Sequence, residues 1–245
     1  MAMYVLIGGA WIGAWAWRDV TRDLRARGHD VYPLSLTGLA ERVHLGNAEV
    51  NLTTHITDVI NLIEFEDLKE VVLVCHSYSG IVAPGVADRI PDRLSRLVYV
   101  DTAPLPSGMS MLDMNSPAGQ AELRATVDRE GEGWKLPVPP FEEIGKMASL
   151  NGLGDAERAR FRAKAVPHPF GTYTESLKLT RATPPAIPQY LIACDNARKM
   201  IDAGGPMLAF LQEPGWSIEM LDTGHWPMLS KPAELAAILD RITSV

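Results

Sequence analysis

The sequence predicts an α/β fold built on a parallel sheet, and two patterns carry this prediction. Short apolar runs rich in β-branched residues recur at positions 4–7, 71–75, 96–100 and 189–193. Continuous apolar strands of this kind suit a parallel sheet that is buried on both faces. Amphipathic stretches separate them, so we expect right-handed crossovers and an open sheet covered by helices.

The first part of the chain shows this alternation element by element. Apolar residues three and four positions apart predict a helix over 17–27, which Gly28 would end as a cap. The segment 29–36 is expected to form a strand, and the same helical spacing returns over 54–64. A final helix is expected over 233–242.

The alternation breaks once, between the strands at 96–100 and 189–193. Prolines cluster after Trp134, short helical patches follow, and no strong strand signal appears. We therefore predict an inserted, mostly helical lid over 107–185. It would divide a single core domain into two parts, 1–106 and 186–245.

Composition excludes several classes of partner. The chain has 245 residues, 47% of them hydrophobic, and a formal net charge of −7, with no Lys or Arg block longer than two residues. A nucleic-acid partner is therefore not expected. No apolar run approaches the roughly 18 residues of a membrane span, and no basic region precedes the first apolar stretch, so neither membrane insertion nor secretion is predicted.

The cysteines and histidines give two further expectations. Cys75 and Cys194 each end an apolar run, as buried thiols do, which favours a reducing cytoplasm over a disulfide framework. The histidines show no paired spacing with cysteines or carboxylates that would form a closed metal site. We predict neither a metal nor a cofactor.

The window from 71 to 90 contains the strongest chemical signal. It reads as strand, tight turn and helix, with Ser77 at the turn, which is the pattern of a nucleophile elbow. The usual motif is G-x-S-x-G, whereas Cys75 and Ser79 occupy the glycine positions here; both are small, so the steric requirement can still be met. The alternative is a serine that only caps the helix.

Two other windows favour the nucleophile. A Gly8-Gly9 turn follows the first strand, where backbone N–H groups could bind an oxyanion. His225 lies in a loop after a late strand, at the same edge of the sheet, where a general base would be placed.

Motifs along nearly the whole chain resemble one family. They include GAWIGAWAW (9–17), LTGLAERVHL (36–45), RLVYVDTAPLPSG (96–108), GEGWKLPVPP (131–140) and GHWPMLSKP (224–232). They are similar to the α/β-hydrolase superfamily, in particular the branch of plant methylesterases, hydroxynitrile lyases and small bacterial esterases. The resemblance implies that fold, and relatives in this branch are often dimers.

The resemblance also implies roles for individual residues. Ser77 would be the nucleophile and His225 its base, and the backbone N–H groups of Tyr78 and Ala10 would form the oxyanion hole. The tryptophans expected to line the substrate pocket are Trp11, Trp134 and Trp226.

The acid of the triad is where the sequence departs most from the family pattern. Members usually read Y-x-x-C/T-x-x-D, with Asp at the seventh position; counted from Tyr190 as the first, this chain has Asp195 sixth and Asn196 seventh. Asp195 could orient His225 after a small loop shift, Asn196 could do so as a neutral acceptor, or Asp101 could reach across from the preceding strand. We favour Asp195.

The leading hypothesis is a serine carboxylic-ester hydrolase acting on a small or medium apolar ester, with a methyl ester as one candidate. Apolar residues of the inserted segment motivate the substrate class: Met109, Met111, Leu112, Met114, Trp134, Phe141 and Phe170. Hydroxynitrile lyases of the branch have Thr at the position of Gly9 and Lys at that of Trp226, which disfavours cyanohydrin chemistry. Two alternatives remain: an enzyme of elimination, cyclisation or lyase chemistry that uses Ser77 and His225, and a non-catalytic ligand-binding protein.

Overall fold

The centre of the molecule is a sheet whose six strands in the described residues are all parallel. The structure is a computed structural model and describes residues 1–181, 183, 185–204 and 210–243. In spatial order the strands are β2 (Asp30–Leu34), β1 (Met3–Ile7), β3 (Val71–His76), β4 (Leu94–Val100), β7 (Gln189–Ala193) and β8 (Trp216–Met220). The predicted parallel α/β sheet is confirmed, and its strands lie within a few residues of the predicted runs.

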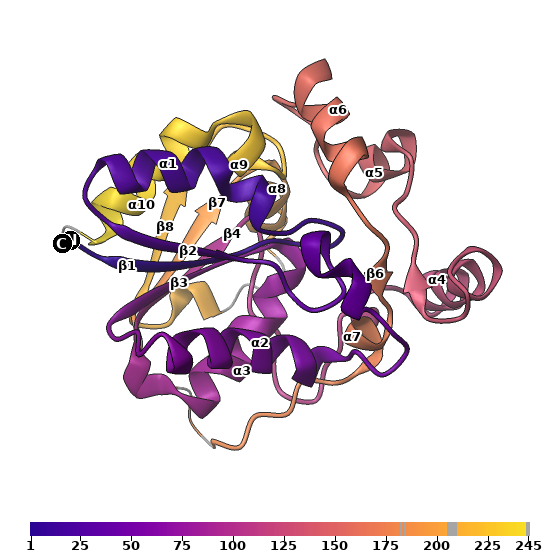
Figure 1. Cartoon of the computed structure of the whole chain (residues 1–245), viewed down its shortest axis with the longest axis horizontal. Coiled ribbons are helices and arrows are strands. Elements are labelled where there is room, and N and C mark those ends of the chain that lie inside the picture. Colours follow the sequence, from indigo (N-terminus) through magenta and orange to yellow (C-terminus); the bar gives the residue numbers. More distant parts are fainter. Residues whose placement is uncertain (182, 184, 205–209, 244–245) are drawn as a thin grey trace.

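Helices cover both faces of this sheet (Figure 1). The core helices are α1 (Arg18–Ala26), α2 (Leu52–Phe65), α3 (Val82–Arg89), α8 (Asp195–Asp202), α9 (Pro227–Ser230) and α10 (Pro232–Thr243). Helices α1 and α10 pack together on one face, and α2 and α3 on the other. Gly28 has φ +87° just after α1, as expected of a glycine that ends a helix.

The central strand β1 and residues 71–75 of β3 are apolar at every position because both faces of the sheet are buried there. Tyr4 and Leu6 belong to the core cluster on the α1 and α10 face, whereas Val5 and Ile7 belong to the cluster on the α2 and α3 face. Side chains alternate between the faces of a strand, so an unbroken apolar run supplies both cores.

The helices of the segment between β4 and β7 lie outside the sheet, beyond the carboxyl ends of the strands, and the chain after them returns past α3 (Figure 1). It contains the helices α4 (Pro117–Glu130), α5 (Phe141–Met147), α6 (Asp155–Lys164) and α7 (Gly171–Thr174). It also contains an antiparallel pair that the sequence pattern did not indicate, β5 (Lys135–Leu136) and β6 (His168–Pro169). Two-residue strands carry no periodicity, which is why they escape prediction. Residues 182 and 184 of the predicted lid lie outside the described residues.

Among the described residues, the helices include none that combines the length and apolar character needed to cross a bilayer.

Candidate active site

Ser77 stands at a sharp turn between β3 and the short helix η3 (Ser77–Ile81). Its φ is +53°, in the left-handed region that side chains other than glycine rarely adopt. This strained conformation is the mark of a nucleophile elbow, in which the turn lifts the hydroxyl clear of the sheet. The carbonyl of Ser77 is held by a hydrogen bond from Thr102 Oγ1 at 2.7 Å.

Both residues that replace the elbow glycines fit without disrupting the turn. Ser79 is fully buried, and its hydroxyl is within hydrogen-bond distance of the carbonyls of His76, at 2.9 Å, and Ile7, at 3.2 Å. Cys75 is fully buried in the core beneath the sheet, and burial raises the pKa of its thiol. The predicted small-residue requirement is therefore met by a hydroxyl that bonds the adjoining backbone and a thiol that packs as an apolar group.

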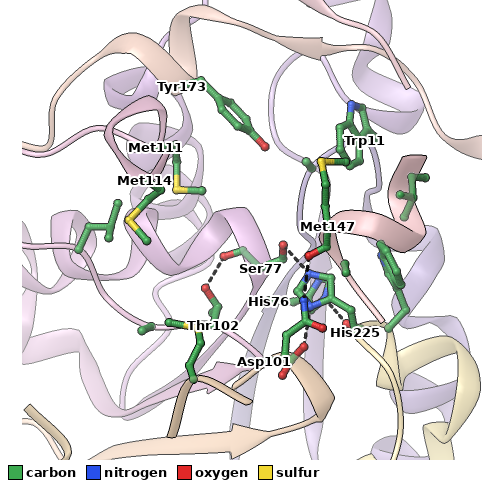
Figure 2. Close-up of a pocket in the computed structure, with 18 of the residues that line it drawn as sticks. Trp11, His76, Ser77, Asp101, Thr102, Met111, Met114, Met147, Tyr173 and His225 are labelled. Atoms are coloured by element: carbon green, nitrogen blue, oxygen red, sulfur yellow. Dashed lines mark hydrogen bonds and ion pairs between the residues drawn. The ribbon is translucent and has the colours of Figure 1, made fainter. Parts of the chain in front are cut away.

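The hydroxyl of Ser77 belongs to a chain of two hydrogen bonds (Figure 2). Ser77 Oγ lies 2.8 Å from His225 Nε2, and His225 Nδ1 lies 2.6 Å from Asp101 Oδ2. Because the carboxylate only accepts, Nδ1–H donates to Asp101 and leaves Nε2 free to accept the serine proton. The structure thus brings Ser77 and His225 together, although 148 positions separate them in the chain.

The side chain of Asp101 is oriented by α8, the helix that follows the neighbouring strand β7. Asp101 comes directly after β4 with φ +49°, and its Oδ1 accepts the backbone N–H groups of Cys194 at 3.1 Å and Ala197 at 2.8 Å, at the start of α8. These bonds satisfy free N–H groups at the amino end of a helix, where a negative charge is stabilised. Oδ2 is left to face His225.

The electrostatics of Asp101 favour the ionised form. Burial alone would raise the pKa of its carboxyl, but the hydrogen bond and positive charge of His225 and the N–H of Ala197 outweigh burial and hold the pKa below its usual range. The Asp101 side chain is fully buried, so its interaction with a positively charged imidazole is weakly screened.

The prediction that Asp195 orients His225 was wrong. Asp195 Oδ2 accepts a hydrogen bond from Ser149 Oγ at 2.6 Å, and Asn196 Oδ1 accepts one from the backbone N–H of Ser149 at 2.9 Å. Both side chains lie at the first turn of α8 and face the inserted segment. The position is taken by Asp101, the third of the alternatives that the sequence left open. The sequence feature that pointed to Asp101 was its position at the end of β4, the strand beside β3.

Ser149 connects that pair back to the site. The backbone N–H of His225 donates to Ser149 O at 2.9 Å, and Gly224 N–H donates to Asn151 O at 3.0 Å. A Cβ at Gly224 would lie 2.5 Å from Ser149 O, so only glycine allows this approach. Asp195 therefore supports the loop of His225 through Ser149.

His76 is a site residue that the sequence did not single out. Its side chain is fully buried, its Nε2–H donates to the backbone carbonyl of His225 at 2.7 Å, and its Nδ1 has no partner among the described residues. Burial, followed by the positive charge of His225, lowers the pKa of His76 to about 3. A neutral His76 imidazole thus holds the His225 loop through a hydrogen bond and adds no charge beside it.

The Gly8-Gly9 turn lies against the elbow. A Cβ at Gly9 would be 2.7 Å from Ser77 Cβ and 2.9 Å from His76 Nδ1, so the backbone there touches the serine directly. Ala10, the next residue, lines the same cavity as Ser77. The side chain of Tyr78 turns away from the cavity, and its hydroxyl bonds His55 Nδ1 at 2.9 Å.

A cavity of about 360 Å³ opens over Ser77 and His225. Its walls are mostly apolar and come from the core and from the inserted segment (Figure 2). Lining residues with flexible or branched apolar side chains are Leu105, Met111, Met114, Ile144, Met147 and Met200. Trp11 and Trp226 also line it, and the Tyr173 hydroxyl points into it from the far side.

Trp134 was predicted to line the substrate pocket, and this prediction was wrong. The described lining of the cavity does not include it, and its ring lies 4.7 Å from Lys135 Nζ, on β5. The carbonyl of Trp134 accepts the N–H of Phe170 at 2.7 Å, which joins two parts of the inserted segment. Its ring also approaches Gly46 of the core, where an added Cβ would lie 3.5 Å from it. Tyr173 supplies the aromatic wall instead.

The chain is similar over most of its length to known alpha/beta hydrolases. The model of the alpha/beta hydrolase family matches residues 4–238. A carbendazim hydrolyzing esterase from a Nocardioides species is 33% identical over 96% of this chain and 97% of its own length. Methylesterase 9 of Arabidopsis thaliana is 28% identical over 100% of this chain and 98% of its own length.

Solved structures of low sequence identity share the fold of this chain. An extracellular alpha/beta-hydrolase from a Paenibacillus species, described as homologous to tobacco salicylic acid binding protein 2, superimposes with a TM-score of 0.82 at 22% identity, covering 98% of both chains. The pyrethroid hydrolase PytH gives a TM-score of 0.73 at 17% identity over 100% of this chain and 98% of its own. At such identities the likeness supports the fold alone.

Proposed function

The chain belongs to the alpha/beta hydrolase family, and on that premise we propose that it is a carboxylic-ester hydrolase with Ser77, His225 and Asp101 as its triad. The observation that carries the proposal is the continuous hydrogen-bond chain from Ser77 Oγ through His225 to Asp101. That arrangement activates a serine hydroxyl, which is otherwise a weak nucleophile. Relatives with similarity over nearly their whole length are esterases and methylesterases.

The reaction follows from the geometry. His225 Nε2 takes the Ser77 proton as Oγ attacks the ester carbonyl, and the resulting imidazolium is stabilised by the Asp101 carboxylate. The same proton then passes to the departing alcohol, leaving an acyl-serine. Water, deprotonated by His225, attacks that ester, and Ser77 regains its proton as the acid is released.

The backbone N–H groups of Ala10 and Tyr78 are the proposed oxyanion donors. Tyr78 immediately follows the nucleophile, and Ala10 immediately follows Gly9, whose backbone packs against Ser77 Cβ. Donors fixed before the reaction and aimed at the developing charge supply a large part of acyl-transfer catalysis.

The cavity supports a small or medium apolar ester as the substrate class. Its volume of about 360 Å³ is at the lower end of ligand pockets, and methionine side chains adapt to differently shaped apolar groups. The Tyr173 hydroxyl, whose pKa is raised by burial, would stay protonated and could donate to a polar atom of the substrate. The inserted segment of residues 107–185 acts as the lid over this pocket.

Gly9 argues against cyanohydrin cleavage. The threonine expected of a hydroxynitrile lyase at this position would need a Cβ 2.7 Å from Ser77 Cβ, a separation that real side chains do not adopt. Trp226, 3% exposed, also offers no ammonium for a departing cyanide.

A fluorophosphonate probe and an ester panel test the proposal. We expect labelling of Ser77 in folded protein, none in Ser77→Ala, and hydrolysis of methyl and p-nitrophenyl esters that declines as the acyl chain lengthens. Absence of labelling in folded wild-type protein would refute the esterase mechanism, and a preference for long charged acyl groups would refute the substrate class.

A further inference from the structure

Trp11 is the residue that fixes the direction of the proposed oxyanion loop. It follows Ala10 directly and has φ +65°, in the left-handed region that is unfavourable for a bulky side chain. A non-glycine residue keeps such a conformation only when its surroundings hold it there. The contacts of Trp11 therefore show what sets the position of the Ala10 amide.

Within the described part of the chain, three hydrogen bonds hold Trp11, and all come from the inserted segment. Its backbone N–H donates to His168 Nδ1 at 3.4 Å, its carbonyl accepts the N–H of Val166 at 3.0 Å, and its indole Nε1–H donates to Leu136 O at 3.3 Å. Leu136 and His168 are paired across β5 and β6. The small sheet of β5 and β6 thus holds in place the loop that contains Ala10, one of the proposed oxyanion donors.

The hydrogen bonds of His168 leave its Nδ1 as the acceptor for the N–H of Trp11. Its Nε2 lies 2.9 Å from Thr172 Oγ1, whose own hydroxyl donates to Pro169 O at 2.8 Å. Thr172 must therefore accept from Nε2–H, which leaves a lone pair on Nδ1 for Trp11. The side chain is fully buried, and burial followed by the nearby His55 lowers its pKa well below the usual value, so the ring stays neutral.

The same ring contacts both other parts of the site. It packs edge-on against Tyr78, with ring centroids 4.5 Å apart, and against Tyr173, at 5.3 Å. Tyr78 carries the second proposed donor on its backbone, and Tyr173 lines the cavity. One buried imidazole therefore connects the two loops that would bind the oxyanion with one wall of the pocket.

We propose that His168 is a positioning residue for the oxyanion hole, which fixes the Ala10 amide through Trp11 and the Tyr78 amide through ring packing. This inference rests on the proposed ester hydrolysis. His168 does not touch the reacting atoms, so it affects how well the donors fit the tetrahedral intermediate. Its loss should lower kcat much more than it raises KM.

Two substitutions separate the two nitrogens of His168. Asn places an oxygen where Nδ1 stands and can still accept from Trp11, whereas Gln places its amide where Nε2 stands and offers nothing at the Nδ1 position. We expect His168→Gln to lower kcat by about 10- to 100-fold, below the loss of about 10²–10³ that follows complete removal of one oxyanion donor. KM should change by less than about threefold, and His168→Asn should recover most of kcat.

Affinity for a trifluoromethyl ketone, which forms an oxyanion on binding the serine, gives a second measurement. His168→Gln should weaken it by the same factor as it lowers kcat/KM, while leaving the affinity for an unreactive ester analogue unchanged. Equal kcat losses in the Gln and Asn variants, or a loss in KM alone, would show that His168 only packs the segment.

Two controls complete the test. If His168→Gln does not fold, Thr172→Val replaces it: losing the partner of Nε2–H should free the ring and lower kcat by about three- to tenfold, and an unchanged kcat would overturn the proposal. Wild-type protein that hydrolyses no ester and takes no fluorophosphonate would instead refute the proposed function.

Discussion

The carboxyl ends of β4 and β7 present two aspartates that the linear sequence makes look equivalent. Asp101 follows β4 and is buried against His225, whereas Asp195 follows β7, is half-buried and bonds Ser149 of the inserted segment. The strands are neighbours in the sheet. The difference shows that a strand end alone does not assign a carboxylate to a triad; its side-chain direction and its hydrogen-bond partners do.

The amino end of α8 explains why Asp101 and Asp195 have different partners. Its free N–H groups bind Asp101 Oδ1 and so turn the other oxygen toward His225. Asp195 and Asn196 belong to the first turn of the same helix and face outward to Ser149, which in turn holds the backbone of His225. One aspartate acts on the imidazole, and the other acts on the loop that carries it.

Replacing Asp101 should have the largest effect. In Asp101→Asn the amide can still accept from α8, but its NH₂ group would face His225 Nδ1 and force the wrong tautomer, so we expect kcat to fall by about 10³–10⁴-fold. Initial rates on a p-nitrophenyl ester measure it, and thermal unfolding checks the fold. A loss smaller than tenfold would remove Asp101 from the triad.

Acid should separate Asp101 from the buried histidines. Burial lowers the pKa of His76 to about 3 and of His55 to about 4, and that of His168 well below the usual value. Unfolded histidines have a pKa of about 6.5, so the unfolded state binds more protons below that pH and stability falls as pH falls. The slope would be about 4 kcal/mol per pH unit if all three histidines contribute fully.

Asp101 responds in a different window. Its pKa in the folded protein lies below the ordinary value of 3.8, so its contribution to stability is present above that value and is lost only as pH falls through the lower, folded value. Urea unfolding at pH 7.5, 6.0 and 5.0 should therefore show falling stability while Asp101 stays ionised. His55→Gln should reduce the slope by about one third, and a flat profile would contradict the neutral buried histidines.

Replacing Asp195 should have the smallest effect on catalysis. Asp195→Ala removes the acceptor of the Ser149 hydroxyl in a half-buried place, so we expect about 1 kcal/mol of lost stability and less than a fivefold change in kcat. Ser149→Ala is the matched variant, and the double variant should cost little more than either single one. Strictly additive losses in a urea-unfolding cycle would show that the two side chains do not cooperate.

The sequence was sufficient for the sheet, the elbow and the histidine because each has a local pattern. Continuous apolar runs marked the strands, and small residues around Ser77 marked the turn. Asp101 could not be chosen from the same kind of pattern, because its direction depends on φ +49° and on amides 93 and 96 positions away. The directions of Trp134 and His168 depend likewise on the pairing of β5 with β6, strands too short to show periodicity.

The most direct test of the account is the rate at which a fluorophosphonate labels Ser77 in Asp101→Asn and in Asp195→Asn, measured side by side with wild-type protein. Labelling requires the activated serine and does not depend on substrate identity. Assignment of the triad to Asp101 predicts labelling slowed at least about hundredfold in Asp101→Asn and within about threefold of wild type in Asp195→Asn. The reverse pattern would contradict it.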